Sequence, residues 1–218
     1  MSTTETPESA PAEQFNTMAQ QRHAGLMGMW VFLITELLLF GGVFGAFIVL
    51  RVQHENVFAE AAHHLDLVLG TINTVLLLTS GLTMALAEQA VSVRRRGLSL
   101  VFLLGTILLG LVFLGIKAYE WHHEYTKQLL PVMDLPFNYP GEHPEVAELF
   151  FNFYYAMTGM HAAHMLIGIV ILAVMAALVA GWRAPAKLDR QIHIVGLYWA
   201  FVDVVWIFVF TVLYLLRG

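Results

Sequence analysis

The stretch YWAFVDVVWIFVFTVLYLL, Tyr198 to Leu216, decides the fold of this chain. It is an apolar run of membrane length that carries one carboxylate, Asp203, with a tryptophan about one turn away on either side. A carboxylate in hydrocarbon costs a few kcal/mol, so Asp203 must face protein, water or a polar partner. Trp199, Asp203, Trp206 and Phe210 share one face at helical spacing. We therefore expect this face to meet protein, with Asp203 either hydrogen-bonded between helices or part of a proton relay.

The composition indicates an integral, multi-pass membrane protein. Hydrophobic residues make up 58% of the 218 residues, charged residues only 12%, and the mean hydropathy is +0.69. Soluble domains are roughly half apolar and about a quarter charged. The chain contains no cysteine, which excludes disulfides, iron–sulfur clusters and thiolate metal sites made from its own side chains. The net charge of -5 is modest, and we expect no nucleic-acid partner.

Five apolar runs are long enough, at about 1.5 Å per residue, to cross a hydrocarbon core of about 30 Å. They cover approximately residues 27–50, 67–87, 98–118, 150–180 and 195–216. The sequence therefore predicts an all-α bundle of five transmembrane helices in a single domain, residues 27–218. Residues 1–26 are predicted to be a disordered polar cytoplasmic tail, because their first part is rich in Ser, Thr, Pro, Glu and Gln.

Several features indicate how the spans pack and connect. Gly41 and Gly45 form a small-xxx-small pair that would let another helix approach closely. Lys117 lies at the end of the third run, where its long side chain is expected to reach the membrane interface. Tyr119 to Leu149 contains four prolines and is predicted to be one long hydrophilic connection. Five polar side chains of the second run are expected to hydrogen-bond between helices: Asn73, Thr74, Thr79, Ser80 and Thr83.

The distribution of basic residues predicts the orientation. Seven lie in segments on the N-terminal side and four in segments on the opposite side or at its boundary. The seven are Arg22, Arg94, Arg95, Arg96, Arg183, Lys187 and Arg190. Because basic residues favour the cytoplasmic side, we expect the N-terminus inside and the C-terminus outside.

Four embedded ionisable residues are candidates for chemistry: Glu36, His161, His164 and Asp203. Glu36 has only Thr35 as a polar neighbour in sequence, so it needs a hydrogen-bond donor from another helix. His161 and His164, three residues apart, can face the same way. Haem ligation across a bundle would need a histidine on each of two facing helices, so a hydrogen-bonded role in the core competes with a cofactor role. The sequence shows no HExxH motif, phosphate-binding glycine loop or serine elbow.

Taken together, five blocks of this sequence resemble subunit III of the haem-copper oxidases. The resemblance extends from Gly28 to the end of the chain, with the blocks in the order found in the family. They are WVFLITELLLFGGVFGAF (Trp30 to Phe47), NTVLLLTSGLTMALA (Asn73 to Ala87), GIKAYEWHHE (Gly115 to Glu124), FYYAMTGMHAAHMLIG (Phe153 to Gly168) and YWAFVDVVWIFVFTVLYL (Tyr198 to Leu215). The chain is similar to the five-helix form, which lacks the two additional N-terminal helices of longer members.

The resemblance implies a subunit of an oxidoreductase complex that is not catalytic by itself. Such a subunit binds phospholipid, and its complex holds haem and copper in a partner, the catalytic subunit I, beside other oxidase subunits. We therefore expect no catalytic, cofactor-binding or metal-binding residue in this chain, and a bacterial inner membrane location. The family's polar landmarks fall on six residues, which we predict to form a buried structural or proton-related cluster: Glu36, Glu120, His161, His164, Asp203 and Trp206.

Two other functions stay open, and one residue departs from the family pattern. The five blocks would equally suit an accessory subunit of a nitric oxide reductase, and a copper-containing partner would distinguish the oxidase from it. An independent di-haem membrane cytochrome is the third interpretation, which visible absorption of the isolated chain would test. The family pattern has a histidine where this chain has Ala200. Any hydrogen bond made by that histidine is missing here.

Overall fold

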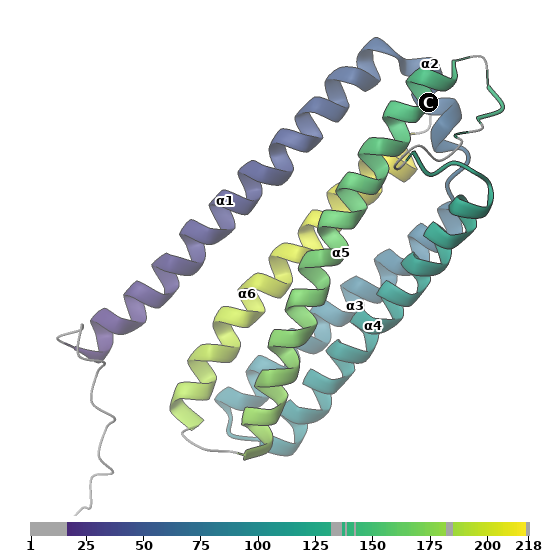
Figure 1. Ribbon diagram of the computed structural model, residues 1–218. Coiled ribbons are helices and arrows are strands. Elements are labelled where there is room, and N and C mark those ends of the chain that lie inside the picture. Colours follow the sequence, from purple (N-terminus) through teal and green to yellow (C-terminus); the bar gives the residue numbers. More distant parts are fainter. Residues whose placement is uncertain (1–16, 132–136, 138, 142, 182–184, 217–218) are drawn as a thin grey trace, which may run out of the picture.

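The computed structural model describes residues 17–131, 137, 139–141, 143–181 and 185–216, and all of its regular elements are helical (Figure 1). The elements are α1 (Met18–Gln53), α2 (Glu55–Ala62), α3 (Leu67–Ser92), α4 (Arg96–Thr126), α5 (Pro144–Gly181), α6 (Pro185–Phe210) and the π-helix η1 (Thr211–Leu215). Within these described residues, five helices are long and apolar enough to cross a membrane. The predicted all-α bundle of five transmembrane helices is confirmed.

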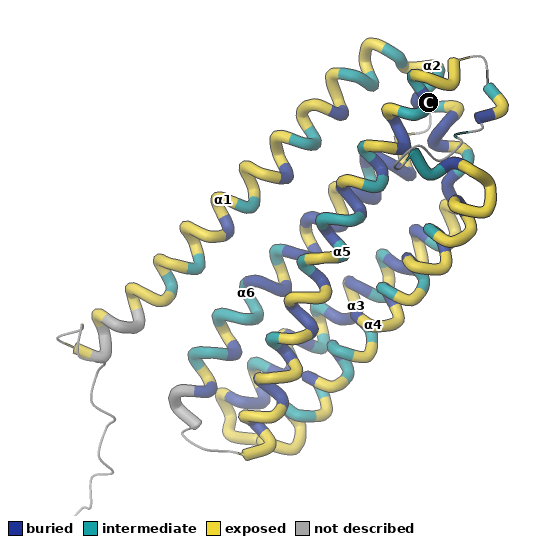
Figure 2. The backbone as a smooth tube through the Cα atoms, viewed as in Figure 1, coloured by how far each residue is buried: buried dark blue, intermediate teal, exposed yellow. Residues whose placement is uncertain are grey.

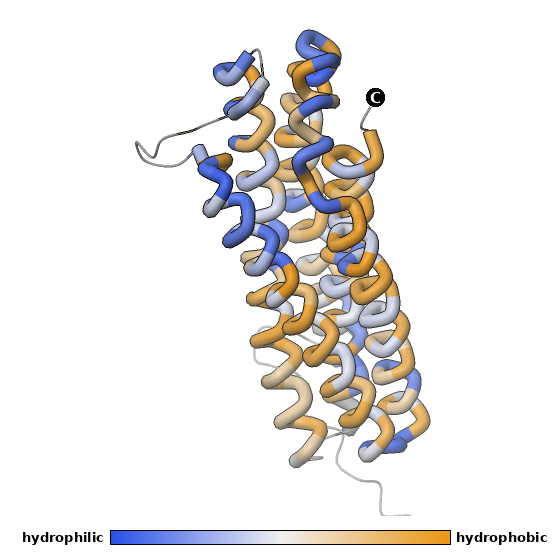
Figure 3. Tube along the Cα trace, turned by 90° about the vertical axis from the view of Figure 1, so that its right-hand side faces the viewer, coloured by the Kyte–Doolittle hydropathy of each residue, from blue (hydrophilic) through white to orange (hydrophobic). Residues whose placement is uncertain are grey.

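The bundle consists of a four-helix core, α3 to α6, with α1 at its edge (Figure 1). Apolar residues predominate along the helices, and hydrophilic turns gather mainly towards their ends (Figure 3). The start of α1 and the end of η1 lie at opposite ends of the bundle, as five spans require (Figure 1). The membrane side on which each end lies stays a prediction.

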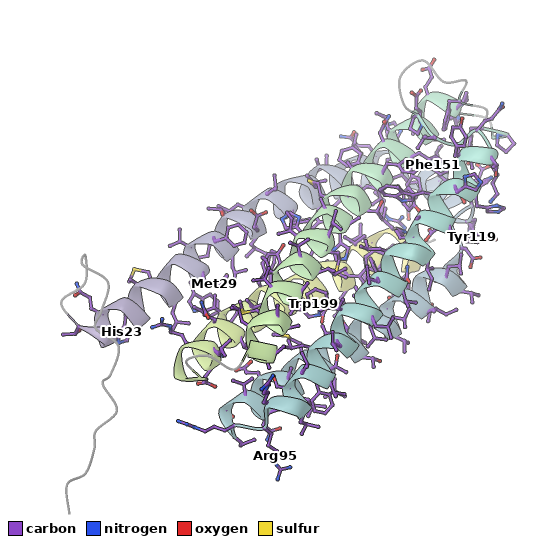
Figure 4. The ribbon with its side chains drawn as sticks, turned by 60° about the horizontal axis from the view of Figure 1, so that its bottom comes forward. His23, Met29, Arg95, Tyr119, Phe151 and Trp199 are labelled. Carbon is purple, nitrogen blue, oxygen red and sulfur yellow. The ribbon has the colours of Figure 1, made fainter. Side chains whose placement is uncertain are left out.

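The last helix is the most buried span, because its large residues fit against small residues of its neighbours. Trp199, Trp206 and Phe210 are buried, as is Asp203 between them. The indole of Trp199 donates to Ser80 Oγ over 3.1 Å, and a methyl group built on Gly168 would lie 3.0 Å from the Trp199 ring. The expectation that this face of the last helix packs against protein is confirmed (Figure 4).

The hydroxyl groups of α3 join helices only in part as predicted. Trp206 Nε1 donates to Thr74 Oγ1 over 3.1 Å, and Thr83 Oγ1 lies 2.8 Å from Thr106 Oγ1 of α4. Thr79, by contrast, donates to the carbonyl of Val75 in its own helix.

The helices extend further than the apolar runs. Asp66 caps α3 by accepting from the N–H groups of Val68 and Leu69, at 2.8 and 3.1 Å. At the start of the chain, α1 already begins at Met18, so the predicted disordered tail is wrong for residues 18–26, and residues 1–16 lie outside the described part. The connection between the first two spans contains α2, whose Phe58, Ala61 and Ala62 are buried.

The largest difference from the predicted organisation concerns the long hydrophilic connection. The helix α4 continues to Thr126 and α5 begins at Pro144, so helical residues occupy both ends of the predicted connection 119–149. The charged residues after the third apolar run predict the end of that helix. The helix α4 continues through them instead, and Lys117, Glu120 and Glu124 are buried rather than in water.

The glycines of α1 also differ from expectation. Gly41 and Gly45 are exposed, and a methyl group built on either would meet no atom within 4 Å. The predicted close approach of another helix at these glycines is therefore wrong for the described part of this chain. Figure 2 shows the same contrast along the whole element, since α1 is mostly exposed while α6 is mostly buried or half-buried.

Candidate functional site

Glu36 finds its partner on α5. His164 Nε2 lies 3.1 Å from Glu36 Oε2, and His164 Nδ1 lies 2.8 Å from the carbonyl oxygen of Met160. A carbonyl oxygen only accepts, so this second contact requires the proton to be on Nδ1. In a neutral ring Nε2 is then an acceptor and Glu36 donates; in a charged ring Nε2 donates to the carboxylate. Either way, one proton lies between Glu36 and His164.

His161 lies one turn from His164 but outside this pair. Its ring is 1% exposed and packs between Phe113 and Trp206, at centroid distances of 5.4 and 5.1 Å. Neither ring nitrogen has a hydrogen-bond partner among the described residues. The two histidines therefore face different surroundings, one polar and one aromatic.

Asp203 packs against the backbone of α3. A methyl group built on Gly81 would lie 2.5 Å from Asp203 Oδ2, so only glycine leaves space for this carboxyl group. Asp203 Oδ1 is buried and has no hydrogen-bond partner in the described part of the chain. The carboxyl group thus lies at a helix–helix contact, between the two tryptophans that bond to α3.

A fourth polar site joins α4, α5 and η1, and we call it the lysine cluster: Lys117, Glu120, Tyr154 and Tyr214. Lys117 Nζ donates to Glu120 Oε2 at 3.0 Å, to Tyr154 Oη at 3.3 Å and to Tyr214 Oη at 2.6 Å. Tyr154 donates to Glu120 Oε1 at 2.9 Å, and Tyr214 donates to the same oxygen. All four residues are at most 2% exposed.

Aromatic rings complete the surroundings of the buried ammonium group. Lys117 Nζ lies 4.9 Å from the ring centroid of Tyr154, 5.2 Å from that of Trp206 and 5.1 Å from that of Tyr214. These distances suit cation–π attraction. A buried lysine needs both a counter-ion and hydrogen bonds to offset desolvation, and this site provides them. The prediction that Lys117 reaches the membrane interface is wrong.

Sequence reasoning did not find the lysine cluster as a site. It named Glu120 as a site residue only through the family resemblance, it placed Trp206 only on the protein-facing side of the last helix, and it did not single out Tyr154 or Tyr214. One signal was available, because Lys117 and Glu120 are three residues apart, a spacing that brings opposite charges together only if the helix continues past Lys117. No proline occurs between Lys117 and Pro131 to prevent this continuation.

The six predicted site residues therefore form no single cluster. Glu36 and His164 are bonded to each other, Asp203 lies against α3, and Glu120 belongs to the lysine cluster. Trp206 lies between His161 and the lysine cluster, since its ring contacts both His161 and the Lys117 ammonium group. Ala200 is exposed on the outer side of α6.

A cavity of about 340 Å³ adjoins the Glu36–His164 pair. It lies between α1, α5 and α6, and apart from the pair its walls are mainly apolar and aromatic. Elsewhere within the described residues, no group of three or more His, Asp or Glu side chains is arranged to hold a metal ion.

The fold and these sites define a class: an integral membrane bundle of five long helices with a few paired polar groups inside. Within this class, the sequence model of the cytochrome c oxidase subunit III family matches residues 13–217. The chain belongs to this family.

Individual bacterial relatives agree with that assignment. The cytochrome c oxidase subunit 3 of Alkalihalophilus pseudofirmus is 35% identical over 195 residues, which are 87% of this chain and 85% of the relative. The protein of the same name from Thermostichus vulcanus is 35% identical over 198 residues, 88% and 87% of the two chains. A probable quinol oxidase subunit 3 of Staphylococcus saprophyticus is 32% identical over 206 residues, 92% and 94% of the two chains.

Proposed function

We propose that this chain docks on the catalytic subunit I of a bacterial haem-copper terminal oxidase in the plasma membrane. The oxidase reduces oxygen with electrons from cytochrome c or a quinol and couples this reaction to proton translocation. The observation that carries the proposal is the match of the subunit III family over almost the whole chain. Relatives of both kinds, named cytochrome c oxidase and quinol oxidase subunits, support the oxidase function over a nitric oxide reductase.

In this proposal the haem and copper belong to the partner. The geometry of the two embedded histidines supports this view. Both ring nitrogens of His164 already have partners, on Glu36 and Met160. The ring of His161 is packed between two aromatic rings inside the core. A haem ligand needs a free imidazole nitrogen facing an open space that can hold the macrocycle.

We further propose that phospholipid covers the outer face of α1 and that this layer stabilises the catalytic partner. Support comes from the exposed apolar residues on this helix, among them Leu37 at 60% and Leu38 at 70% exposure. An apolar face of this kind needs hydrocarbon or protein against it. Lipid chains held on this face of α1 would stabilise the catalytic partner, and this role requires no redox group in the present chain.

Glu36→Gln in the intact complex tests this function. Glutamine keeps the size of the side chain but cannot carry the carboxyl proton that lies between Glu36 and His164. We expect unchanged haem and copper content, a near-normal initial oxygen-consumption rate and an earlier loss of activity during sustained turnover. The measurement combines haem and metal quantification with oxygen consumption followed to inactivation.

Two results would contradict the proposal. Loss of haem in the Glu36→Gln complex would show that the residue supports cofactor retention. A catalytic partner that co-purifies without copper would favour the nitric oxide reductase interpretation. Thr35→Ala provides a matched control, because this exposed neighbour donates only to the Phe32 carbonyl of its own helix.

A further inference from the structure

The cavity beside Glu36 has its polar groups at the deep end. Glu36 lies near the middle of the span His23–Gln53, and the cavity continues from it towards Met29, nearer the start of α1. A phospholipid has the opposite polarity, with its charged headgroup at the membrane interface and hydrocarbon at depth. The deep polar wall therefore suits a molecule whose polar part is neutral and lies within the hydrocarbon layer.

The walls of the cavity suit a flat ring. Phe32 and Tyr198 line it with aromatic rings whose centroids are 6.1 Å apart and whose planes differ by 37°. Its volume of about 340 Å³ falls at the lower end of the roughly 300–1,000 Å³ typical of small-molecule sites. Such a space accommodates one substituted ring but not a long tail.

The cavity opens towards the bilayer. Two of its wall residues, Phe32 and Ile167, are 39% and 53% exposed on the outer surface of the bundle. A hydrocarbon tail attached to a bound ring could leave between α1 and α5 without crossing the core. Met29, at the end of the cavity nearer the start of α1, is half-buried and packs against the core.

The Glu36–His164 pair can accept a hydrogen bond from a ligand. His164 contacts one carboxyl oxygen, Oε2, which leaves the other oxygen of the same group for a ligand. The proton of the pair lies between Glu36 and His164, so this second oxygen has no proton to donate and only accepts. An acceptor of this kind fits the hydroxyl group of a ring in its reduced form.

We propose that this cavity binds the head ring of an isoprenoid quinone in its reduced, quinol form. One ring hydroxyl group donates to Glu36, the ring lies against Phe32 and Tyr198, and the tail extends into the bilayer. The proposal concerns binding only and assigns no electron transfer to this chain. It goes beyond the proposed function, because an oxidase subunit that docks and binds phospholipid needs no such site.

A tryptophan placed in the cavity tests the proposal directly. Ile171 lines the cavity, whereas the next residue, Val170, is 58% exposed on the outer surface of the same helix. Ile171→Trp therefore fills the space, and Val170→Trp is the matched control. The purified wild-type and variant complexes are depleted of quinone and titrated, without oxygen, with the reduced form of a decyl-tailed ubiquinone analogue. Bound analogue is counted by extraction and chromatography, and haem content and subunit composition are measured in parallel.

We expect Ile171→Trp to weaken binding at this site at least about tenfold, which is roughly 1.4 kcal/mol, while Val170→Trp binds as the wild type does. Any quinone site in a partner subunit would be present in the wild-type complex and in both variants. It would therefore not affect the difference in binding between them. Equal binding in the three complexes would overturn the proposal. Loss of co-purified phospholipid from the Ile171→Trp complex with unchanged quinone binding would also overturn it, and would assign the cavity to an acyl chain.

A photoreactive azidoquinone in its reduced form gives a second test in the unaltered complex. We expect it to label peptides of α1 and α5 around Glu36 and His164, and excess decyl analogue to suppress this labelling. Labelling of other chains alone would contradict the proposal, even if the Ile171→Trp complex failed to assemble. Intact haem content and subunit composition with no labelling of this chain would contradict the quinone site while leaving the proposed docking function unaffected.

Discussion

The four-helix core and α1 cross the same membrane but pack in different ways. Half of the most apolar window of α6 is buried inside the chain, against 17% of that of α1. The core helices fit together through glycines, indole hydrogen bonds and the lysine cluster. By contrast, α1 contacts the core mainly through residues such as Phe40, Phe47 and the Glu36–His164 pair. The difference teaches that contacts within this chain hold the core together, whereas they leave most of the α1 surface uncovered.

The largest predicted effect comes from the lysine cluster of the core. Lys117→Met removes the ammonium group and leaves Glu120 buried without its counter-ion. We therefore expect the free energy of unfolding to fall by about 3–5 kcal/mol. The matched control is Arg95→Met, because Arg95 is exposed just before the start of α4. We expect the control to change stability by about 0.5 kcal/mol or less. Thermal aggregation of this chain from the detergent-solubilised complex measures both, and equal effects would refute a structural role for the lysine cluster.

A methyl group at two glycines compares the core with α1 directly. A Cβ atom at Gly70 would lie 2.9 Å from the ring of Tyr214 and 3.1 Å from that of Phe210, whereas Gly41 has open space. We expect Gly70→Ala to destabilise the chain by about 1–3 kcal/mol through overpacking. Gly41→Ala should stay within about 0.5 kcal/mol of the wild type. If Gly41→Ala is the more harmful change in the intact complex, a partner helix packs on that glycine.

Two tryptophans make a finer comparison. Trp206→Phe removes the hydrogen bond from the indole to Thr74. Because the Thr74 hydroxyl group can still bond to the backbone of its own helix, we expect stability to fall by only about 1 kcal/mol. Trp30 on α1 is 56% exposed, and Trp30→Phe should have a smaller effect. The melting temperatures of the two purified variant complexes, each compared with the wild type, measure the two effects. Similar losses would mean that both rings are packed against protein in the complex.

The smallest predicted effect lies outside the membrane spans, where Tyr139 packs against His64 at a ring distance of 5.3 Å. Burial, together with the nearby charge of Glu60, raises the pKa of Tyr139 from 10.0 to about 12. The neutral phenol therefore stabilises this contact fully below about pH 10, and the contribution disappears as the pH rises to about 12. Tyr139→Phe should abolish this alkaline loss, a difference of about one or two degrees in melting temperature. A wild type and variant with parallel melting curves from pH 9 to 12 would contradict the assignment.

Much of this architecture could be predicted from the sequence because it depends on local hydrophobicity. The five apolar runs define the spans, and the spacing of Trp199, Asp203 and Trp206 identifies the protein-facing side of the last helix. The lysine cluster could not be predicted in this way. Its members are distant in sequence, and a lysine near the end of an apolar run looks the same whether it reaches water or a buried carboxylate.

The site was predictable only as a set of residues. Sequence reasoning named Glu36, His161 and His164 as neighbours, but it could not tell which histidine bonds to Glu36. Which histidine bonds to Glu36 depends on how α1 packs against α5, and no local sequence pattern specifies this packing. The prediction for the glycines of α1 was wrong for a different reason. A small-xxx-small pattern permits another helix to pack closely, but it does not show that such a helix is present.

The central claim is that this chain provides a scaffold and a lipid-facing surface to the redox centres of a partner and holds none itself. The most direct test is to separate the chain from the purified complex under mild detergent conditions and measure its iron, copper and visible absorption. The account predicts that haem and copper remain with the catalytic partner and that the separated, still helical chain is colourless. A Soret band, or iron or copper in stoichiometric amount in the separated chain, would contradict it.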